Sequence, residues 1–218
     1  MRRIFFGLVL ISLLSLAFAA PAPAKERADG IVHWDFDVYL DDKKVGNHSF
    51  KVSETGDVKQ VQSEASFKVK FLFITAYRYE HSAAERWTGN CLVEFDGNTN
   101  ANGERIEVSG EQISGGFIVE RGDNPIELPE CVMTFAYWNA EFLDQRRLLN
   151  PQTGEYVEVL VEKVGDEMLE VRGLEVAATR FKLTANDVDL TLWYSPDDEW
   201  LALESVAEGG RIIRYELS

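Results

Sequence analysis

The chain of 218 residues carries 37 acidic residues against 22 basic ones, which gives a formal net charge of −15 at pH 7. This acidic balance argues against nucleic acid and anionic membrane surfaces as partners, because both repel a negatively charged protein. Apolar residues make up 45% of the sequence, enough for a sizeable hydrophobic core in a chain of this length.

Residues 1–24 have the pattern of a secretory signal peptide. Two arginines precede an apolar run over residues 4–18, and small residues then permit cleavage after Ala19 or after Ala24. The run is shorter than the roughly 20 residues that span a bilayer, and no second such run follows. We therefore expect export to the periplasm and no transmembrane segment in the mature chain.

The sequence that follows alternates polar and apolar residues in short segments. In residues 31–40 every second side chain is apolar, which is typical of a half-buried strand: Trp34, Phe36, Val38 and Leu40. Polar turns at residues 41–44 and 54–57 separate this segment from the next two, and the pattern continues to the end of the chain. The sequence predicts one β domain over residues 25–218, built as a single curved antiparallel sheet or an open β-barrel.

Residues 132–150 interrupt the strand pattern and predict a short helical insert that the surrounding sheet holds in place. Asn139 is suited to cap a helix over residues 140–149, and Pro151 ends it. Turn residues flanked by aromatic ones occur in pocket lids and also in ordinary packed corners. Both interpretations of the insert remain open at this point.

Cys91 and Cys131 are the only cysteines in the sequence. In an exported protein an isolated pair favours a disulfide, which would clip the insert to the sheet. The closed loop of about 40 residues would stabilise the fold by about 3 to 4 kcal/mol. A redox or metal-binding pair is disfavoured, because the CxxC spacing and neighbouring ligands are missing.

His33, Asp35 and Asp37 alternate along one predicted strand and are the candidate metal ligands. Successive residues on one face of a strand lie about 7 Å apart, too far to share an ion unless another strand contributes. A solvated strand face is the simpler interpretation, so we expect neither a bound metal nor a cofactor.

His81 with Glu80 or Glu85 is the candidate for acid–base catalysis. Glu85 shares a strand face with His81, but a packed, hydrogen-bonded histidine is the simpler interpretation. The sequence has no G-x-S-x-G, H-E-x-x-H, P-loop or dinucleotide fingerprint. A hydrolase using His81 and Glu85 is therefore the weakest of our functional hypotheses.

Aromatic residues are more numerous than one small core obviously needs. A curved sheet with these residues on its concave face can enclose an apolar cavity, although a large aromatic core is the alternative. The predicted ligand-binding residues are Phe71, Phe73, Tyr77, Tyr79, His81, Trp87, Tyr137, Trp138, Asn139 and Trp193.

Several segments resemble a known family. They are WDFDVYLD (residues 34–41), YRYEH (77–81) with Glu85 and Trp87, YWN (137–139), LLNPQTG (148–154) and LWY (192–194). Together they resemble the domain-of-unknown-function family 6134 (DUF6134), a family of exported bacterial proteins, over nearly the whole mature chain. LLNPQTG is the most specific segment. The resemblance implies an open β-barrel and supplies no catalytic residues, because the family has no established activity.

Two hypotheses lead. In the first, a periplasmic protein binds an apolar or lipid-like ligand in its curved sheet, and the insert covers one opening. In the second, a module of the cell envelope binds another protein through an exposed sheet edge or through the surface of the insert.

Overall fold

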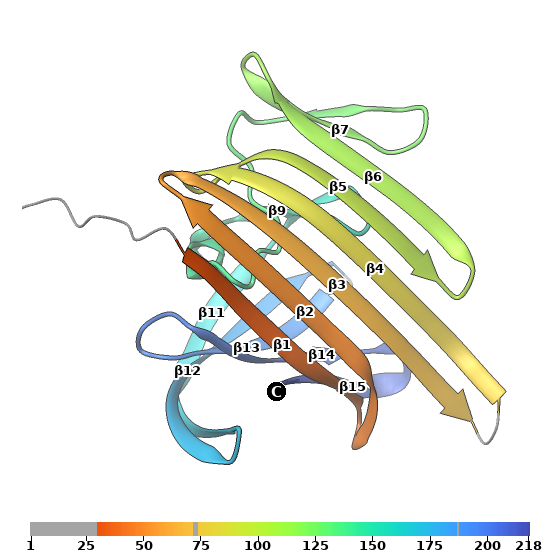
Figure 1. The fold of residues 1–218 in the computed structure, drawn as a ribbon, viewed down its shortest axis with the longest axis vertical. Coiled ribbons are helices and arrows are strands. Elements are labelled where there is room, and N and C mark those ends of the chain that lie inside the picture. Colours follow the sequence, from red (N-terminus) through yellow and green to blue (C-terminus); the bar gives the residue numbers. More distant parts are fainter. Residues whose placement is uncertain (1–29, 72–73, 187) are drawn as a thin grey trace, which may run out of the picture.

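One antiparallel sheet of 13 strands dominates the computed structural model, which describes residues 30–71, 74–186 and 188–218 (Figure 1). The strand order is β11-β12-β13-β14-β15-β1-β2-β3-β4-β5-β6-β7-β8. Strands β11 and β8 are the two ends of this order, so the sheet of the described residues is open. The predicted fold class, a mainly β chain with a single curved antiparallel sheet or an open β-barrel, is confirmed.

The strands that precede the insert follow one another as neighbours. They are β1 (Gly30–Leu40), β2 (Lys43–Thr55), β3 (Val58–Phe71), β4 (Ile74–Thr88), β5 (Cys91–Ala101), β6 (Glu104–Ile113), β7 (Gly116–Glu120) and β8 (Ile126–Leu128). The strands that follow it are β11 (Leu160–Val171), β12 (Leu174–Ala185), β13 (Val188–Tyr194), β14 (Trp200–Val206) and β15 (Ile212–Leu217). A 3-10 turn, η2 (Glu208–Gly210), lies between β14 and β15.

Strand β1 illustrates why these segments form a sheet. From residue 34 onward, every second position carries an apolar side chain that is at most 8% exposed: Trp34, Phe36, Val38 and Leu40. Because side chains alternate between the two faces of a strand, this pattern buries one face and leaves the other in water. Gly56, with φ of 60°, makes the tight turn between β2 and β3, where residues with a Cβ are disfavoured.

The pairing of β15 with β1 joins the two halves of the chain. Phe36 lies opposite Leu217 and Leu40 lies opposite Ile213 in this pairing. Figure 1 shows β1 to β5 as a broad layer in front and β13 and β14 behind it. The sheet therefore folds over, and its inner face encloses the main hydrophobic core.

The predicted insert extends over residues 129–159 and contributes Phe142, Leu148 and Leu149 to the core, each 0% exposed. It contains the 3-10 turn η1 (Ala140–Asp144) and the short strands β9 (Arg147–Leu149) and β10 (Tyr156–Glu158). The predicted helix is thus shorter than residues 140–149. Its second half is a strand, because β9 pairs with β10 and the Leu149 amide donates to the Met133 carbonyl.

A disulfide joins Cys91, at the start of β5, to Cys131 in the insert. Beside it, the Leu92 amide donates to the Val132 carbonyl across 3.0 Å. The predicted disulfide and its role as a clip between sheet and insert are confirmed. No helix within the described ranges is long and apolar enough to span a membrane.

Candidate functional site

A cavity of about 350 Å³ lies between the inner face of the sheet and the insert. Strands β2 to β4 form one wall, the insert segments 134–138 and 150–152 form the second, and β13 to β15 form the third. The walls come from parts of the chain that are far apart in sequence. The cavity is therefore a product of the folding-over of the sheet.

Small side chains at the centre of β3 and β4 leave this space open. Ser63 and Ala83 lie opposite each other in the pairing of the two strands, and Ala65 follows two positions along β3. These three positions are at most 8% exposed, and they line the cavity with side chains of only one or two heavy atoms. The far wall is apolar, with Val188 and Leu190 among its residues.

Polar contacts hold the insert at a fixed place above the cavity. The Tyr79 hydroxyl donates to Gln152 Oε1 across 2.7 Å, and the Tyr194 hydroxyl donates to the Tyr137 carbonyl across 2.7 Å. A Cβ at Gly97 would overlap the carbonyl oxygen of Pro151, so the insert touches the backbone of β5 there. These contacts allow the insert to cover the cavity without collapsing into it.

Glu85 supplies a carboxyl group to the cavity. Its Oε2 accepts a hydrogen bond from Trp87 Nε1 across 2.9 Å, and Thr134 of the insert also hydrogen-bonds to the side chain. Glu85 keeps some accessible surface because it borders the cavity, but protein atoms crowd around the carboxyl. This burial raises the pKa of Glu85 to about 7, against the lowering effect of the two hydrogen bonds.

Two buried histidines line the cavity in hydrogen-bonded pairs. His48 Nε2 lies 2.8 Å from Ser63 Oγ, and His81 Nδ1 lies 3.0 Å from Thr99 Oγ1. Burial lowers the pKa of His48 to about 3 and that of His81 to about 4. Both imidazoles are therefore neutral at neutral pH and act as hydrogen-bonding polar groups rather than charges.

The structure gathers five of the predicted ligand-binding residues around this cavity: Tyr77, Tyr79, His81, Tyr137 and Trp138. Trp87 lies behind Glu85, fully buried, with its ring 5.5 Å edge-on from that of Trp138. Phe73 and the side chain of Phe71 lie outside the described residues.

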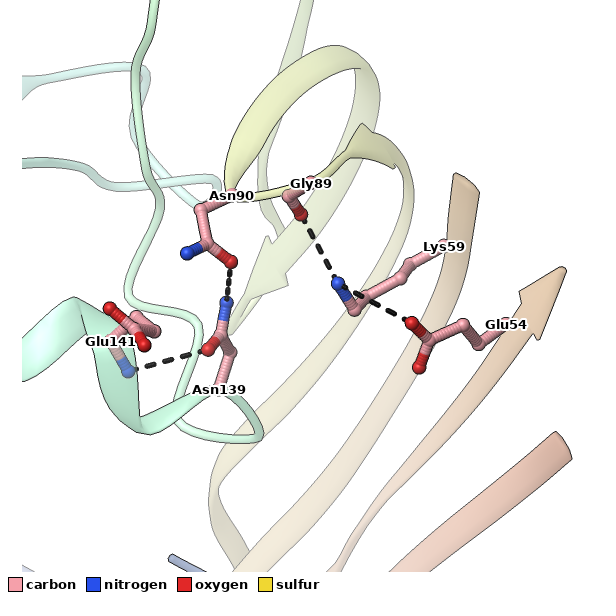
Figure 2. Close-up of polar contacts among 6 residues, drawn as sticks. All are labelled: Glu54, Lys59, Gly89, Asn90, Asn139 and Glu141. Carbon is pink, nitrogen blue, oxygen red and sulfur yellow. Dashed lines mark hydrogen bonds and ion pairs between the residues drawn. The ribbon is translucent and has the colours of Figure 1, made fainter. Parts of the chain in front are cut away.

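Two other predicted residues lie away from the cavity. Asn139 caps η1 by accepting from the Glu141 amide, and its Nδ2 donates to Asn90 Oδ1 across 3.3 Å, as Figure 2 shows. Trp193 belongs to a separate cluster, and its Nε1 donates to Glu167 Oε1 across 2.6 Å. Asn139 thus fastens the insert to the turn beside the disulfide, while Trp193 packs on the opposite face of β13 from Leu190.

The two groups of the hydrolase hypothesis line the same cavity but do not meet. His81 and Glu85 are four residues apart on β4, which corresponds to about 13 Å along a strand. Each is hydrogen-bonded to another partner, Thr99 and Trp87. A direct proton transfer between them needs a distance of about 3 Å.

The candidate metal ligands on β1 are spread over its outer surface. His33 and Asp35 are exposed, and Asp37 pairs with Lys44 across 2.6 Å. Within the described ranges, no group of three or more His, Cys, Asp or Glu side chains is arranged to hold a metal ion.

The sequence did not single out several residues that line the cavity, among them His48, Ser63 and Tyr215. The small side chains of Ser63, Ala65 and Ala83 on a predicted inner face are a local signal for a hollow. The contribution of Tyr215 has no such signal, because β15 reaches the cavity only through its pairing with β1.

Fold and site together define an open, folded-over β-sheet protein with a covered internal cavity. The chain belongs to the family described as domain of unknown function DUF6134, whose model matches residues 36–218. No curated protein matches the sequence.

Among solved structures, the chain is similar to the crystal structure of a β-barrel-like protein of domain of unknown function DUF1849 from Brucella abortus. The TM-score is 0.61 at 7% sequence identity, and the match covers 85% of this chain and 94% of that chain. At this identity the likeness shows the fold alone.

Proposed function

We propose that the protein is exported to the periplasm and binds an apolar or lipid-like ligand in the cavity between the sheet and the insert. The observation that carries this proposal is the hollow at Ser63, Ala65 and Ala83, whose other sides are lined mainly by apolar and aromatic side chains. Its volume of about 350 Å³ is in the range of small-molecule sites, about 300 to 1,000 Å³.

Two features support export. Residues 1–24 have the pattern of a signal peptide, with two arginines before an apolar run. The disulfide between Cys91 and Cys131 is of the kind that persists in an oxidising compartment such as the periplasm. Fractionation of cells that express the full chain tests this point, and recovery of the protein in the cytoplasm with residues 1–24 attached contradicts it.

A cavity-filling variant with a matched control tests ligand binding. Ala83 faces the cavity and is 7% exposed, whereas its neighbour Ala84 is exposed on the outer face of β4. We expect Ala83→Phe to weaken binding of an apolar fluorescent dye at least about tenfold, a loss of about 1.4 kcal/mol. Ala84→Phe should leave the affinity for the dye unchanged. Equal binding by both variants, with unchanged melting temperatures, contradicts the proposal.

A second measurement identifies the natural occupant. Native mass spectrometry and lipid extraction of protein purified from the periplasm are expected to show a bound apolar molecule, which Ala83→Phe loses. Ligand-free protein that also fails to bind the dye contradicts the proposal.

The edge strand β11 favours a second candidate function, a module that binds another protein in the cell envelope. It is the outermost strand of the sheet and carries exposed apolar side chains at Leu160, Val164 and Met168. A partner strand can add to such an edge. A photo-crosslinker at Val164 should then capture a partner that the same group at Glu64, on the exposed face of β3, does not capture.

A further inference from the structure

The charged groups of the cavity are distributed in a way that bears on the ligand. Glu85 is the only carboxyl among the described residues that line the cavity, and none of these residues is Lys or Arg. The two lining histidines, His48 and His81, are neutral because burial lowers the pKa of each well below neutrality. An ionised Glu85 is therefore the only full charge of the described cavity wall, and it is negative.

The immediate partners of Glu85 favour the ionised form. Trp87 Nε1 donates to the carboxyl, and the side chain of Thr134 hydrogen-bonds to it. Both interactions lower the pKa of Glu85, while burial raises it. An approaching positive charge would favour the carboxylate further, because an opposite charge within a few ångströms stabilises the ionised form.

The lining of the cavity extends along β4. Its lining residues on β4 take every second position from Tyr77 to Glu85, about 26 Å of strand. Tyr77 at one end is 40% exposed, whereas the Glu85 end adjoins the fully buried Trp87. A volume of about 350 Å³ over this extent suits one extended chain better than a flat ring system or a two-chain lipid.

We propose that the ligand is a single-chain amphiphile with an amine head group, whose ammonium pairs with Glu85 while its apolar chain extends along β4 toward Tyr77. This inference rests on the proposed ligand-binding function. A carboxylate or phosphate head would add a second negative charge to a cavity wall whose described residues offer no cation, and burying an unpaired charge is costly. A neutral alcohol would donate a hydrogen bond to the Glu85 carboxylate but would gain no charge pairing.

Calorimetric titration with octylamine, octanol and octanoate at about pH 8 tests the head group at constant chain length. We expect octylamine to bind at least about tenfold more tightly than octanol, and octanoate to bind most weakly. Glu85→Gln should remove the advantage of the amine and leave octanol binding within about threefold. Glu80→Gln, on the exposed face of the same strand, should retain the advantage and so controls for adsorption to the acidic surface.

A pH series provides a test that needs no variant. Below about pH 7 Glu85 takes up a proton, so octylamine affinity should fall by up to about tenfold per pH unit until its advantage over octanol is lost, while octanol affinity stays constant. The other titratable groups that line the cavity with Glu85 are His48 on β2, Tyr77, Tyr79 and His81 on β4, Tyr137 on the insert and Tyr215 on β15. Burial keeps both histidines neutral at and above about pH 5.

The outcomes separate this inference from the proposed function. Octanoate binding as tightly as octylamine, or an amine preference that persists in a folded Glu85→Gln variant, overturns the inference alone. Binding of octylamine that Ala83→Phe does not weaken also overturns it, because the amine then binds outside the cavity. If none of the three compounds binds, the proposed function itself fails.

Discussion

The indole Nε1 of Trp87 donates a hydrogen bond to Glu85 Oε2 across 2.9 Å, although the two residues belong to one strand. In a regular strand, residues two positions apart lie about 7 Å from each other on the same face. A register shift between Arg86 and Trp87 interrupts β4 at this point. Trp87 also packs edge-on against Trp138, so the carboxyl is held where sheet and insert meet.

The raised pKa of Glu85 makes stability depend on pH. The folded value is about 7 against an ordinary 4.5, so between these values the folded state binds more protons than the unfolded state. The contribution of Glu85 to the stability of the folded state is therefore most favourable below about pH 4.5, and it is lost as pH rises through 7. Urea unfolding should show that the wild type loses stability relative to Glu85→Gln between about pH 5 and pH 8. A difference in stability between the wild type and Glu85→Gln that does not change with pH contradicts the prediction.

His48 should stay neutral in the folded protein. Burial lowers its pKa from 6.5 to about 3, so its contribution to stability is present above pH 6.5 and is lost as pH falls toward 3. NMR of the imidazole should show no titration between about pH 8 and pH 5 in the native state. The same signal should titrate near 6.5 in urea, which is the internal control. A native midpoint near 6.5 would show that water reaches the ring freely.

Removing the disulfide should destabilise the protein without changing its fold. The bond closes a loop with a sequence separation of 40, which corresponds to about 4 kcal/mol in the chain-entropy model. The double variant Cys91→Ser with Cys131→Ser should lose about this much in urea unfolding and keep its far-UV spectrum. Adding reductant should then destabilise the wild type but not the variant. Equal stability of the two under non-reducing conditions contradicts the prediction.

Gly97 is expected to tolerate no side chain. A Cβ at this position would overlap the carbonyl oxygen of Pro151, which belongs to the insert. Gly97→Ala should therefore lift the insert from β5 and cost about 1 to 3 kcal/mol, as overpacking does. Asp96→Ala, the neighbouring exposed position, should change stability by less than about 0.5 kcal/mol. Thermal unfolding of the two variants compares them directly, and similar melting temperatures would argue against close contact.

The sequence by itself determined the strands and their inner faces. Alternating side chains such as Trp34, Phe36 and Val38 bury one face of any strand they form, whatever its neighbours are. It also determined the disulfide, because Cys91 and Cys131 have no other cysteine to pair with. The aromatic positions on β4 were identified for the same local reason, since Tyr77, Tyr79 and His81 share one face.

The tertiary structure alone decided which of these faces enclose a cavity. The wall formed by β13 to β15 depends on the pairing of β15 with β1. Just beyond the paired residues, Arg211 donates to Asp41, which is 170 positions away in the sequence. The alternation of apolar and polar side chains predicts which face of a strand is buried. It does not predict which other residues pack against that face. For this reason Trp193 was predicted at the site but packs on the other face of β13, and the second half of the predicted helix pairs as β9. Long-range strand pairing decides both outcomes, because it fixes which distant residues share the interior.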